Sequence, residues 1–269
     1  MSTNRLGRVE NLDQFWHQTH LKSSESRVDL KIPEEPETVE SLDEISEYPY
    51  DGQDRYSGTL EFHFTDWQGN SRTEDGEYEY RSESGLFLLQ LDSGRVDPED
   101  ILETLNQQFG NSGKIKDSIS VKREALWSFF EEADQYDTLT LTGPEGRFDF
   151  TTLKQVAHRV SHDDIANYNS IEDLELSAEI QEPEKVQDVL PLLNKVDLHG
   201  DIESINDLGV DPAKYFIERS EVHFEFRDEL VSVTYDRGNL RINDDATQLS
   251  REYVTQLFEQ KVVYPSYGR

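Results

Sequence analysis

Apolar and polar residues alternate in the stretch that begins at residue 56, and this pattern narrows the fold more than any other feature of the sequence. Leu60, Phe62 and Phe64 alternate with polar neighbours, which is the two-residue period of a strand with one buried face. A turn and two further strands are expected at residues 66–70, 77–81 and 86–91. The last of these is apolar on both faces, as is typical of a central strand. The stretch therefore predicts an antiparallel meander.

A helix is expected directly after this meander. Asp97 can accept hydrogen bonds from the free amides of a first helical turn, and Pro98 suits the first helical position. The same order returns nearer the C-terminus, with strands expected at 222–226, 230–235 and 240–242 and a helix at 248–260. This recurrence raises the hypothesis of a diverged internal duplication, with chance repetition in a mixed fold as the alternative.

The remaining elements complete a mixed pattern. Residues 138–150 predict a β-hairpin, because the Gly143-Pro144-Glu145-Gly146 turn supplies the positive φ angles that a reversal needs. Other helices are expected at 9–21, 123–133, 151–160 and 183–193, and other strands at 115–121 and 174–180. We therefore predict an α+β fold of two small subdomains, each an antiparallel β-meander flanked by helices.

Three parts are expected along the chain. Residues 1–55 are predicted to be an N-terminal helix plus an acidic extended linker, residues 56–165 a first α+β subdomain, and residues 166–269 a second. The linker is placed at 22–55, with weak helix around 38–46, because this stretch carries three of the nine prolines and many acidic residues. A polar run at 161–170 favours the boundary between the subdomains.

The chain is strongly acidic, with 26 basic and 57 acidic residues and a formal net charge of −31. Leu, Ile, Val and Phe nevertheless make up about a quarter of the residues, above the roughly 20% below which a charged chain stays disordered. The acidic residues are spread along the whole sequence and are not gathered in one tail. We therefore expect a folded protein with an acidic surface.

This composition resembles that of proteins from extreme halophiles. Like charges repel at low ionic strength, but in molar salt the Debye length falls to about 3 Å and the repulsion is screened. An ordinary acidic protein with a solvated surface is the alternative. The even spread of the acidic residues favours the halophile interpretation.

Composition also narrows the expected location and chemistry. The chain has no cysteine, which excludes disulfides, thiolate nucleophiles and cysteine-ligated metals. Neither a secretory signal nor an apolar window of membrane-spanning length is present, so we expect a soluble cytoplasmic protein with no membrane partner. Nucleic-acid binding is not supported, because the sequence has no basic stripe and phosphate backbones repel an acidic surface. No cofactor is expected.

Two groups of residues have the spacing of metal ligands. His158 and His162 lie four apart near the end of a predicted helix, with Asp163 next, and a histidine pair at this spacing can face one metal ion. Polar residues at a helix end are the alternative, because histidines favour the negative end of the helix dipole. His158, His162 and Asp163 are the candidate metal ligands.

The second group is Val196-Asp197-Leu198-His199-Gly200-Asp201, whose Asp-x-His-Gly core resembles the first metal-binding motif of the calcineurin-like metallophosphoesterases. Asp236-Arg237-Gly238 is similar to an Asp-Arg-Gly found in some of these enzymes. The resemblance implies a divalent metal pair that activates water. The sequence departs from the family pattern, because no Gly-Asn-His follows and residues 236–238 fall in an expected hairpin turn. A polar turn after a helix is the alternative for the first motif.

We favour a non-enzymatic protein-binding or scaffold role, with a metal-dependent hydrolase or nuclease as the alternative. Neither a phosphate-binding loop nor a Gly-x-Ser-x-Gly motif is present, and no catalytic residue is assigned. Aromatic residues are over-represented at protein contacts. Several of them occur in segments expected at the periphery: Phe15, Trp16, Tyr48, Tyr50, Trp67, Tyr264 and Tyr267. Phe15 and Trp16 are the candidate partner-binding residues. The expected partner is another protein, and self-association is left open.

Overall fold

The computed structural model describes residues 3–10, 28–33, 35–93, 95–109, 114–116, 119–144, 146–150, 205, 211–243 and 245–268. Contacts between residues divide the chain into two compact units. Unit 1 comprises residues 1–120 and 238–269, and unit 2 comprises residues 121–237. The fold is α+β and mostly antiparallel β-sheet, in agreement with the predicted class. The helices of the described residues include none that is long and apolar enough to cross a membrane.

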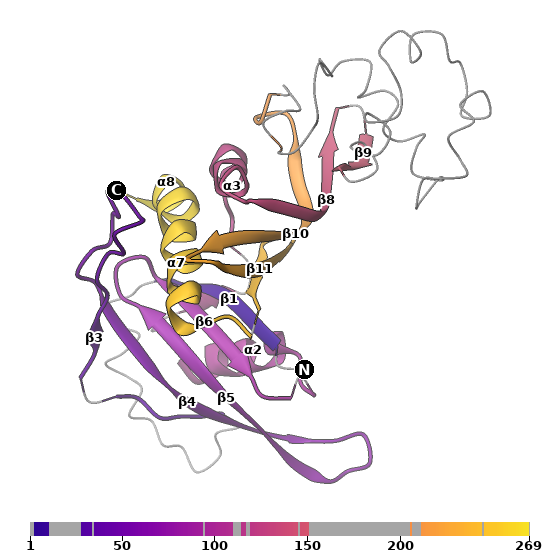
Figure 1. Ribbon diagram of the computed structural model, residues 1–269. Coiled ribbons are helices and arrows are strands. Elements are labelled where there is room, and N and C mark those ends of the chain that lie inside the picture. Colours follow the sequence, from indigo (N-terminus) through magenta and orange to yellow (C-terminus); the bar gives the residue numbers. More distant parts are fainter. Residues whose placement is uncertain are drawn as a thin grey trace, which may run out of the picture. The chain divides into compact units, whose positions relative to one another are not determined.

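Unit 1 is built on a seven-stranded sheet in its described part, with the strand order β2-β4-β5-β6-β1-β7 and with β3 paired to β4 (Figure 1). Every pair in this sheet is antiparallel. The strands are β1 (Thr3–Glu10), β2 (Val28–Leu30), β3 (Glu37–Thr38), β4 (Asp54–Thr65), β5 (Ser71–Arg81), β6 (Leu86–Leu91) and β7 (Lys114–Lys116). The other elements of the unit are α2 (Pro98–Phe109), β12 (Asn239–Ile242), α7 (Gln248–Phe258), the π-helix η6 (Glu259–Val263) and α8 (Tyr264–Tyr267).

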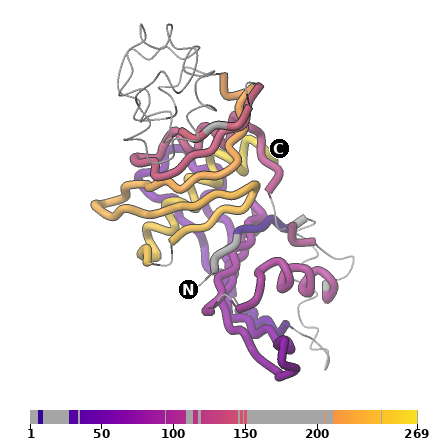
Figure 2. Tube along the Cα trace, turned by 90° about the vertical axis from the view of Figure 1, so that its right-hand side faces the viewer, coloured from indigo at the N-terminus to yellow at the C-terminus, as the bar shows by residue number. Residues whose placement is uncertain are grey.

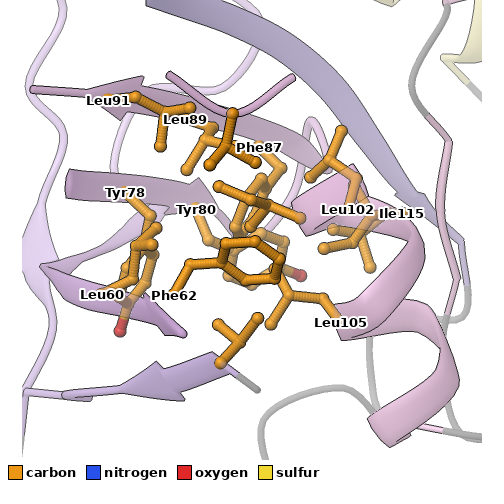
Figure 3. Close-up of a cluster of buried hydrophobic side chains, with 14 residues drawn as sticks. Leu60, Phe62, Tyr78, Tyr80, Phe87, Leu89, Leu91, Leu102, Leu105 and Ile115 are labelled. Carbon is orange, nitrogen blue, oxygen red and sulfur yellow. The ribbon is translucent and has the colours of Figure 1, made fainter. Parts of the chain in front are cut away.

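The register of the sheet separates an apolar face from a polar one. Tyr78 pairs with Leu89 across β5 and β6, and both side chains are buried in one cluster. The cluster also receives Leu102 and Leu105 from α2, so α2 covers this face (Figure 3). Because neighbouring residues of a strand point to opposite faces, Glu79 and Arg81 lie on the other face. There Arg81 donates to Glu252 of α7 and to Glu79. The sheet of unit 1 therefore has a helix on each side.

The first meander is confirmed, and it is longer than the alternation predicted. Strand β4 pairs with β5 from Arg55 opposite Arg81 to Thr65 opposite Ser71. The third strand, β6, lies between β5 and β1, as expected for a segment that is apolar on both faces. Helix α2 begins at Pro98 as predicted. The Asp97 side chain accepts a hydrogen bond from the amide of Glu99 at 2.9 Å, so it caps the helix.

Unit 2 contains α3 (Arg123–Phe130), β8 (Gln135–Gly143), β9 (Gly146–Asp149), β10 (Phe216–Phe226) and β11 (Glu229–Asp236). Its described strands are hydrogen-bonded in the antiparallel order β11-β10-β8-β9 (Figure 2). Helix α3 packs on them through Phe129, whose ring lies 4.9 Å from that of Phe224. The hairpin predicted at 138–150 is confirmed as β8 and β9. Arg227 and Asp228, with φ of 49° and 68°, form the expected turn between β10 and β11.

The N-terminal part differs from its expectation. Val9 lies in strand β1, where the sequence predicted the start of a helix, and residues 11–27 lie outside the described part. The stretch expected as an extended linker contains β2 and β3, and no helix covers 38–46. Several of its apolar residues are buried, among them Val39, Ile45, Tyr48 and Tyr50. The expectation that Tyr48 and Tyr50 lie at the periphery is therefore wrong. Isolated apolar positions have no period from which a sequence can indicate burial, because their partners are distant in the chain.

Some expectations stay predictions. The helices expected at 151–160 and 183–193, the strand at 174–180 and the boundary at 161–170 lie outside the described residues. The proposed duplication joins residues 77–109, which fall within unit 1, to residues 222–260, which are divided between the two units. That division does not favour the duplication, which stays a hypothesis.

The two faces of β6 provide a test of this register. Leu89 is buried against α2, with 1% of its surface exposed, whereas Leu88 is half-buried on the opposite face. Leu89→Ala is expected to lower the free energy of unfolding by about 2–5 kcal/mol, because it leaves a cavity in the core. Leu88→Ala is expected to lower it by about 1 kcal/mol. Urea unfolding of both variants in molar KCl measures the difference, and equal losses would contradict the assignment of faces.

Candidate functional site

Helix α7 turns polar side chains toward the sheet of unit 1. Glu252, Gln256 and Glu259 follow one another at spacings of four and three residues, which places them on one face of the helix. Gln256 and Glu259 are fully buried, with no measurable exposed surface. The helix widens into the π-helix η6 at Glu259. Buried carboxylates are rare unless they are paired, so this face requires a positive partner.

That partner is Arg81, which is 1% exposed and comes from the polar face of β5. Its Nη1 lies 2.7 Å from Glu259 Oε2, and its Nη2 lies 2.6 Å from Glu252 Oε2. Its Nε lies 2.6 Å from Oε1 of Glu79 on the same strand. Burial alone would lower the pKa of Arg81, but the surrounding carboxylates outweigh burial and raise it well above its ordinary value. The guanidinium therefore stays charged inside the protein.

The loop before β4 supplies further hydrogen-bond donors to the carboxylate of Glu259. Glu259 accepts hydrogen bonds from the hydroxyl of Tyr48 and from Nε2 of Gln53, the latter at 3.1 Å. Burial, and then the charge of Glu259, raise the pKa of Tyr48 far above its ordinary value, so the hydroxyl keeps its proton and donates. Gln53 in turn accepts from the amide of Ser84 at 3.2 Å. The buried charges are thus satisfied from β5, α7 and the loop.

Helix α7 also holds the acidic segment that the sequence interpreted as a linker. Nε2 of Gln256 donates to the carbonyl oxygen of Glu40 at 2.8 Å, and its Oε1 accepts from the amide of Leu42 at 3.0 Å. The side-chain amide of Gln256 thus donates to one backbone carbonyl of the loop and accepts from one backbone N–H, as a neighbouring strand would. They explain why residues 39–53 are ordered on the helix despite their acidic composition.

A cleft of about 580 Å³ opens between the polar face of the sheet and α7. Its lining combines apolar residues of several strands, among them Leu88 of β6 and Leu240 and Ile242 of β12, with arginines and carboxylates. Arg55 lines it and donates from Nη1 to Glu252 Oε2 at 3.1 Å, while its buried Nε has no hydrogen-bond partner. An apolar floor with a few convergent polar groups is the usual composition of a binding pocket.

A second cleft, of about 590 Å³, lies beside the distal part of the β4–β5 hairpin. Polar residues of the hairpin and of α2 dominate its lining, including His63, Thr65, Asp97, Asp100 and Glu103. Its apolar contribution comes mainly from Phe62 and Phe64, whose rings stack 6.0 Å apart. The second cleft therefore has less apolar surface for a ligand to contact than the first cleft has.

The tip of the β4–β5 hairpin presents Trp67, which is 90% exposed. Strand β6 accompanies β5 only as far as Gly76, and β2 accompanies β4 only as far as Phe62. In the described part of the chain, the end of the hairpin therefore extends past its neighbouring strands (Figure 1). The indole stands at the end of this projection.

The turn that carries Trp67 is held in one conformation by Asp66. Its Oδ1 accepts from the amides of Gln68 at 2.9 Å and Asn70 at 2.8 Å, and its Oδ2 lies 3.0 Å from Nε of Arg72. The hydrogen bond from the Asn70 amide, followed by those from the side chains, lowers the pKa of Asp66 to about 2. Gly69 takes the positive φ of 84° that the turn requires. The tryptophan is therefore displayed on a preorganised turn.

The candidate residues from the sequence mostly lie outside the described part of the chain. This holds for the metal candidates His158, His162 and Asp163, for residues 196–201, and for Phe15 and Trp16. Asp236 ends β11, and Arg237 and Gly238 have positive φ angles, as expected for a hairpin turn. Among the residues that the structure describes, no group of three or more His, Asp or Glu side chains could hold a metal ion.

Sequence reasoning missed Arg81, Glu252 and Glu259. A signal was present in the last helix, where Glu252, Gln256 and Glu259 recur at helical spacing beside apolar residues that are buried, such as Val254, Leu257 and Phe258. Comparison with known protein-family models and with curated proteins gives no match.

The buried network predicts a large effect of removing its cation. Arg81→Met keeps most of the side-chain volume but leaves Glu259 buried without its counter-charge, so the free energy of unfolding should fall by about 3–5 kcal/mol. Lys31→Met is the matched control, because Lys31 and Glu61 form an exposed pair at 3.4 Å, and its loss should be at most about 1 kcal/mol. Urea unfolding in molar KCl measures both. Similar losses in the two variants would show that the buried network does not stabilise unit 1.

Proposed function

We propose that this is a non-enzymatic binding protein that holds another protein through the tip of the β4–β5 hairpin. The observation that carries the proposal is the 90% exposure of Trp67 on an ordered turn. A tryptophan buries about 150–250 Å² when it is covered, and tryptophan is among the residues that dominate binding energy at protein interfaces. A solvent-exposed indole at a projecting tip is suited to this role.

The surroundings of Trp67 support the same conclusion. The other large apolar side chains exposed in the described residues, Leu230, Leu249 and Tyr264, are 41–50% exposed, so Trp67 stands apart from them. Residues 67–70 carry no charge in a chain of which 31% is charged. Because Asp66 already fixes the turn, little conformational entropy remains to be lost on binding. Phe15 and Trp16 stay a second predicted contact for the same partner.

We extend the proposal to the setting in which the protein works. The net charge of −31 supports a cytoplasm of high salt, where the charges on the surface are screened. The two predicted α+β subdomains, residues 56–165 and 166–269, stay a prediction, because unit 1 joins residues 1–120 to residues 238–269 and so takes parts of both. The alternative, a metal-dependent hydrolase or nuclease, rests on residues outside the described part of the chain.

Replacement of Trp67 tests the binding role. Trp67→Ala should leave the free energy of unfolding within about 0.5 kcal/mol of the original, because the side chain is exposed, while affinity for the protein partner falls at least about tenfold. Leu249→Ala is the matched control and should keep the affinity. The measurement is recovery of partners by the tagged full-length chain in molar KCl, with light scattering to size the complexes. Equal recovery by the Trp67→Ala variant would contradict the proposal.

Dilution of salt tests the proposed setting. When KCl is lowered from molar concentration to about 0.1 M, the Debye length grows from about 3 Å to about 10 Å, and repulsion among the acidic residues spreads across the surface. The free energy of unfolding is therefore expected to fall, and the far-ultraviolet circular dichroism to show loss of structure. Stability that is constant or rises during this dilution would overturn the high-salt interpretation.

A further inference from the structure

The β4–β5 hairpin directs part of its backbone away from the sheet close to Trp67. In an antiparallel strand the N–H and C=O of one residue point to the same edge, and successive residues point to opposite edges. The carbonyl of Asp75 accepts from the amide of Asp92 at 3.0 Å, so the odd-numbered residues of β5 direct these groups away from β4. Ser71 and Thr73 belong to this set. Their N–H and C=O groups form an edge of the sheet, here called the β5 edge.

Glu74 ends the neighbouring strand before it reaches the β5 edge. The register of β5 with β6 extends to Gly76 opposite Leu91. Beyond this pair, the amide of Ser93 donates to Oε1 of Glu74 at 2.7 Å, and Glu74 is 2% exposed. The chain that leaves β6 is thus held by a buried side chain and not by the backbone of β5. In the described part of the chain, no residue is hydrogen-bonded to the outward backbone groups of the β5 edge.

The spacing of these outward groups fits an extended polypeptide backbone. Each residue of the edge presents one donor and one acceptor, and in an antiparallel pairing both bond to a single residue of the added strand. Ser71 and Thr73 are exposed, and they carry neither the charge nor the proline ring with which proteins commonly block an open edge. Addition of a strand to such an edge is a general mode of peptide binding.

The sequence of the β5 edge disfavours a second copy of the chain as the added strand. If two such edges pair with Ser71 opposite Thr73, the two copies of Arg72 lie directly opposite each other, and like charges in that position are destabilising. If Thr73 lies opposite Thr73, Ser71 must pair with Asp75, whose carbonyl already accepts from Asp92. A strand of another protein with an uncharged residue opposite Arg72 avoids both conflicts.

Trp67 and the β5 edge are neighbours on the hairpin. Strand β5 begins at Ser71, directly after the turn of residues 66–70, so a strand added along the edge runs toward the turn that displays Trp67. Backbone hydrogen bonds would fix the direction of the added strand, and the indole would cover an apolar side chain at its end. Neither contact depends on net charge, so both can form in molar salt.

We infer that the hairpin binds its partner as an added β-strand: an extended, uncharged segment of another protein pairs antiparallel with Ser71 and Thr73, and Trp67 covers its end. The inference rests on the proposed function, since it names the kind of segment that the same tip holds. The contact is small beside a standard interface of about 1,600 Å². An isolated strand is therefore expected to bind weakly.

A synthetic strand tests the inference on the full chain. The probe is acetyl-Thr-Val-Thr-Val-Thr-amide in molar KCl, chosen for its uncharged β-branched residues, and the measurement is residue-resolved amide hydrogen exchange. The amides of Ser71 and Thr73 should exchange fast without the probe and at least about fivefold more slowly with the probe in excess. The amides of Arg72 and Glu74 face β4 and should exchange slowly throughout. The same peptide with N-methylated threonines is the control and should change nothing.

Thr73→Pro removes one outward N–H, and Thr73→Val is its matched control. Proline is tolerated at an edge position whose N–H is outside the ladder, so both variants should unfold at similar urea concentrations. Each variant also loses the hydroxyl that lies 3.2 Å from Nδ1 of His63. Affinity for the probe should fall at least about fivefold in Thr73→Pro and stay unchanged in Thr73→Val. If Thr73→Pro does not fold, the exchange measurement on the unmodified chain decides.

Three results of the exchange measurement would overturn the inference. One is fast exchange of both edge amides at every probe concentration. Another is slow exchange before the probe is added, because a second copy or another segment of the chain would then already cover the edge. The third is equal slowing by the N-methylated peptide.

Recovery of protein partners separates the inference from the proposed function. Recovery that depends on Trp67 but is equal for Thr73→Pro and Thr73→Val would overturn the inference and leave the proposed function standing. Equal recovery by Trp67→Ala and the unmodified chain would overturn the proposed function. If the probe still protects the edge amides in that case, the β5 edge binds a strand without Trp67.

Discussion

The burial of Arg81 among carboxylates is the interaction on which the structure of unit 1 depends. Charges leave water only when each is paired and hydrogen-bonded, and here one guanidinium meets Glu259, Glu252 and Glu79. The pairing joins β5 to α7, and Tyr48 and Gln53 attach the preceding loop to the same carboxylate. A helix that carries three polar side chains on its inner face could not pack on an apolar sheet. The charged side chains on this face of the sheet and those on α7 can therefore be buried only when they are paired with one another.

The same pairing explains why a cleft exists beside α7. Apolar side chains interdigitate and close the space between a helix and a sheet, but charged groups hold the two at hydrogen-bonding distance through long side chains. Arg55 and Glu252 bridge the gap at the edge of the network, and the space next to them stays open. On the opposite face, Tyr78 and Leu89 pack with Leu102 and Leu105 of α2 in one apolar cluster (Figure 3). The second cleft opens farther along the hairpin, where polar residues of β4 and α2 dominate the lining. The two faces of one sheet thus differ because their residues alternate.

The sequence predicted the elements whose signals are local. The period of Leu60 and Phe62, the cap at Asp97 and the turn at residues 143–146 each depend on neighbours within a few positions, and each is confirmed by the structure. The Arg81–Glu259 pair joins residues 178 positions apart. The helical spacing of polar residues around Glu259 therefore does not identify its partner on β5. With 57 acidic residues in the chain, the few that are buried cannot be told apart from the many that are solvated. The role of Val9 in a strand was missed for a similar reason, because its partner Ile115 in β7 is distant in sequence.

Recognition by an acidic protein in high salt favours shape and apolar contact over charge. Screening to about 3 Å removes long-range attraction and repulsion alike, so charged groups select a partner only where they touch it, whereas burial of apolar surface keeps its strength or gains from excluded salts. An uncharged turn that displays one indole on a fixed hairpin meets this condition. Trp67 was identifiable from sequence as a peripheral aromatic residue within a turn, but its exposure depends on how far β4 and β5 extend past β2 and β6. How far one strand extends past its neighbours depends on the pairing of the whole sheet. A local sequence pattern does not contain that information, so it does not distinguish this tryptophan from other aromatic residues.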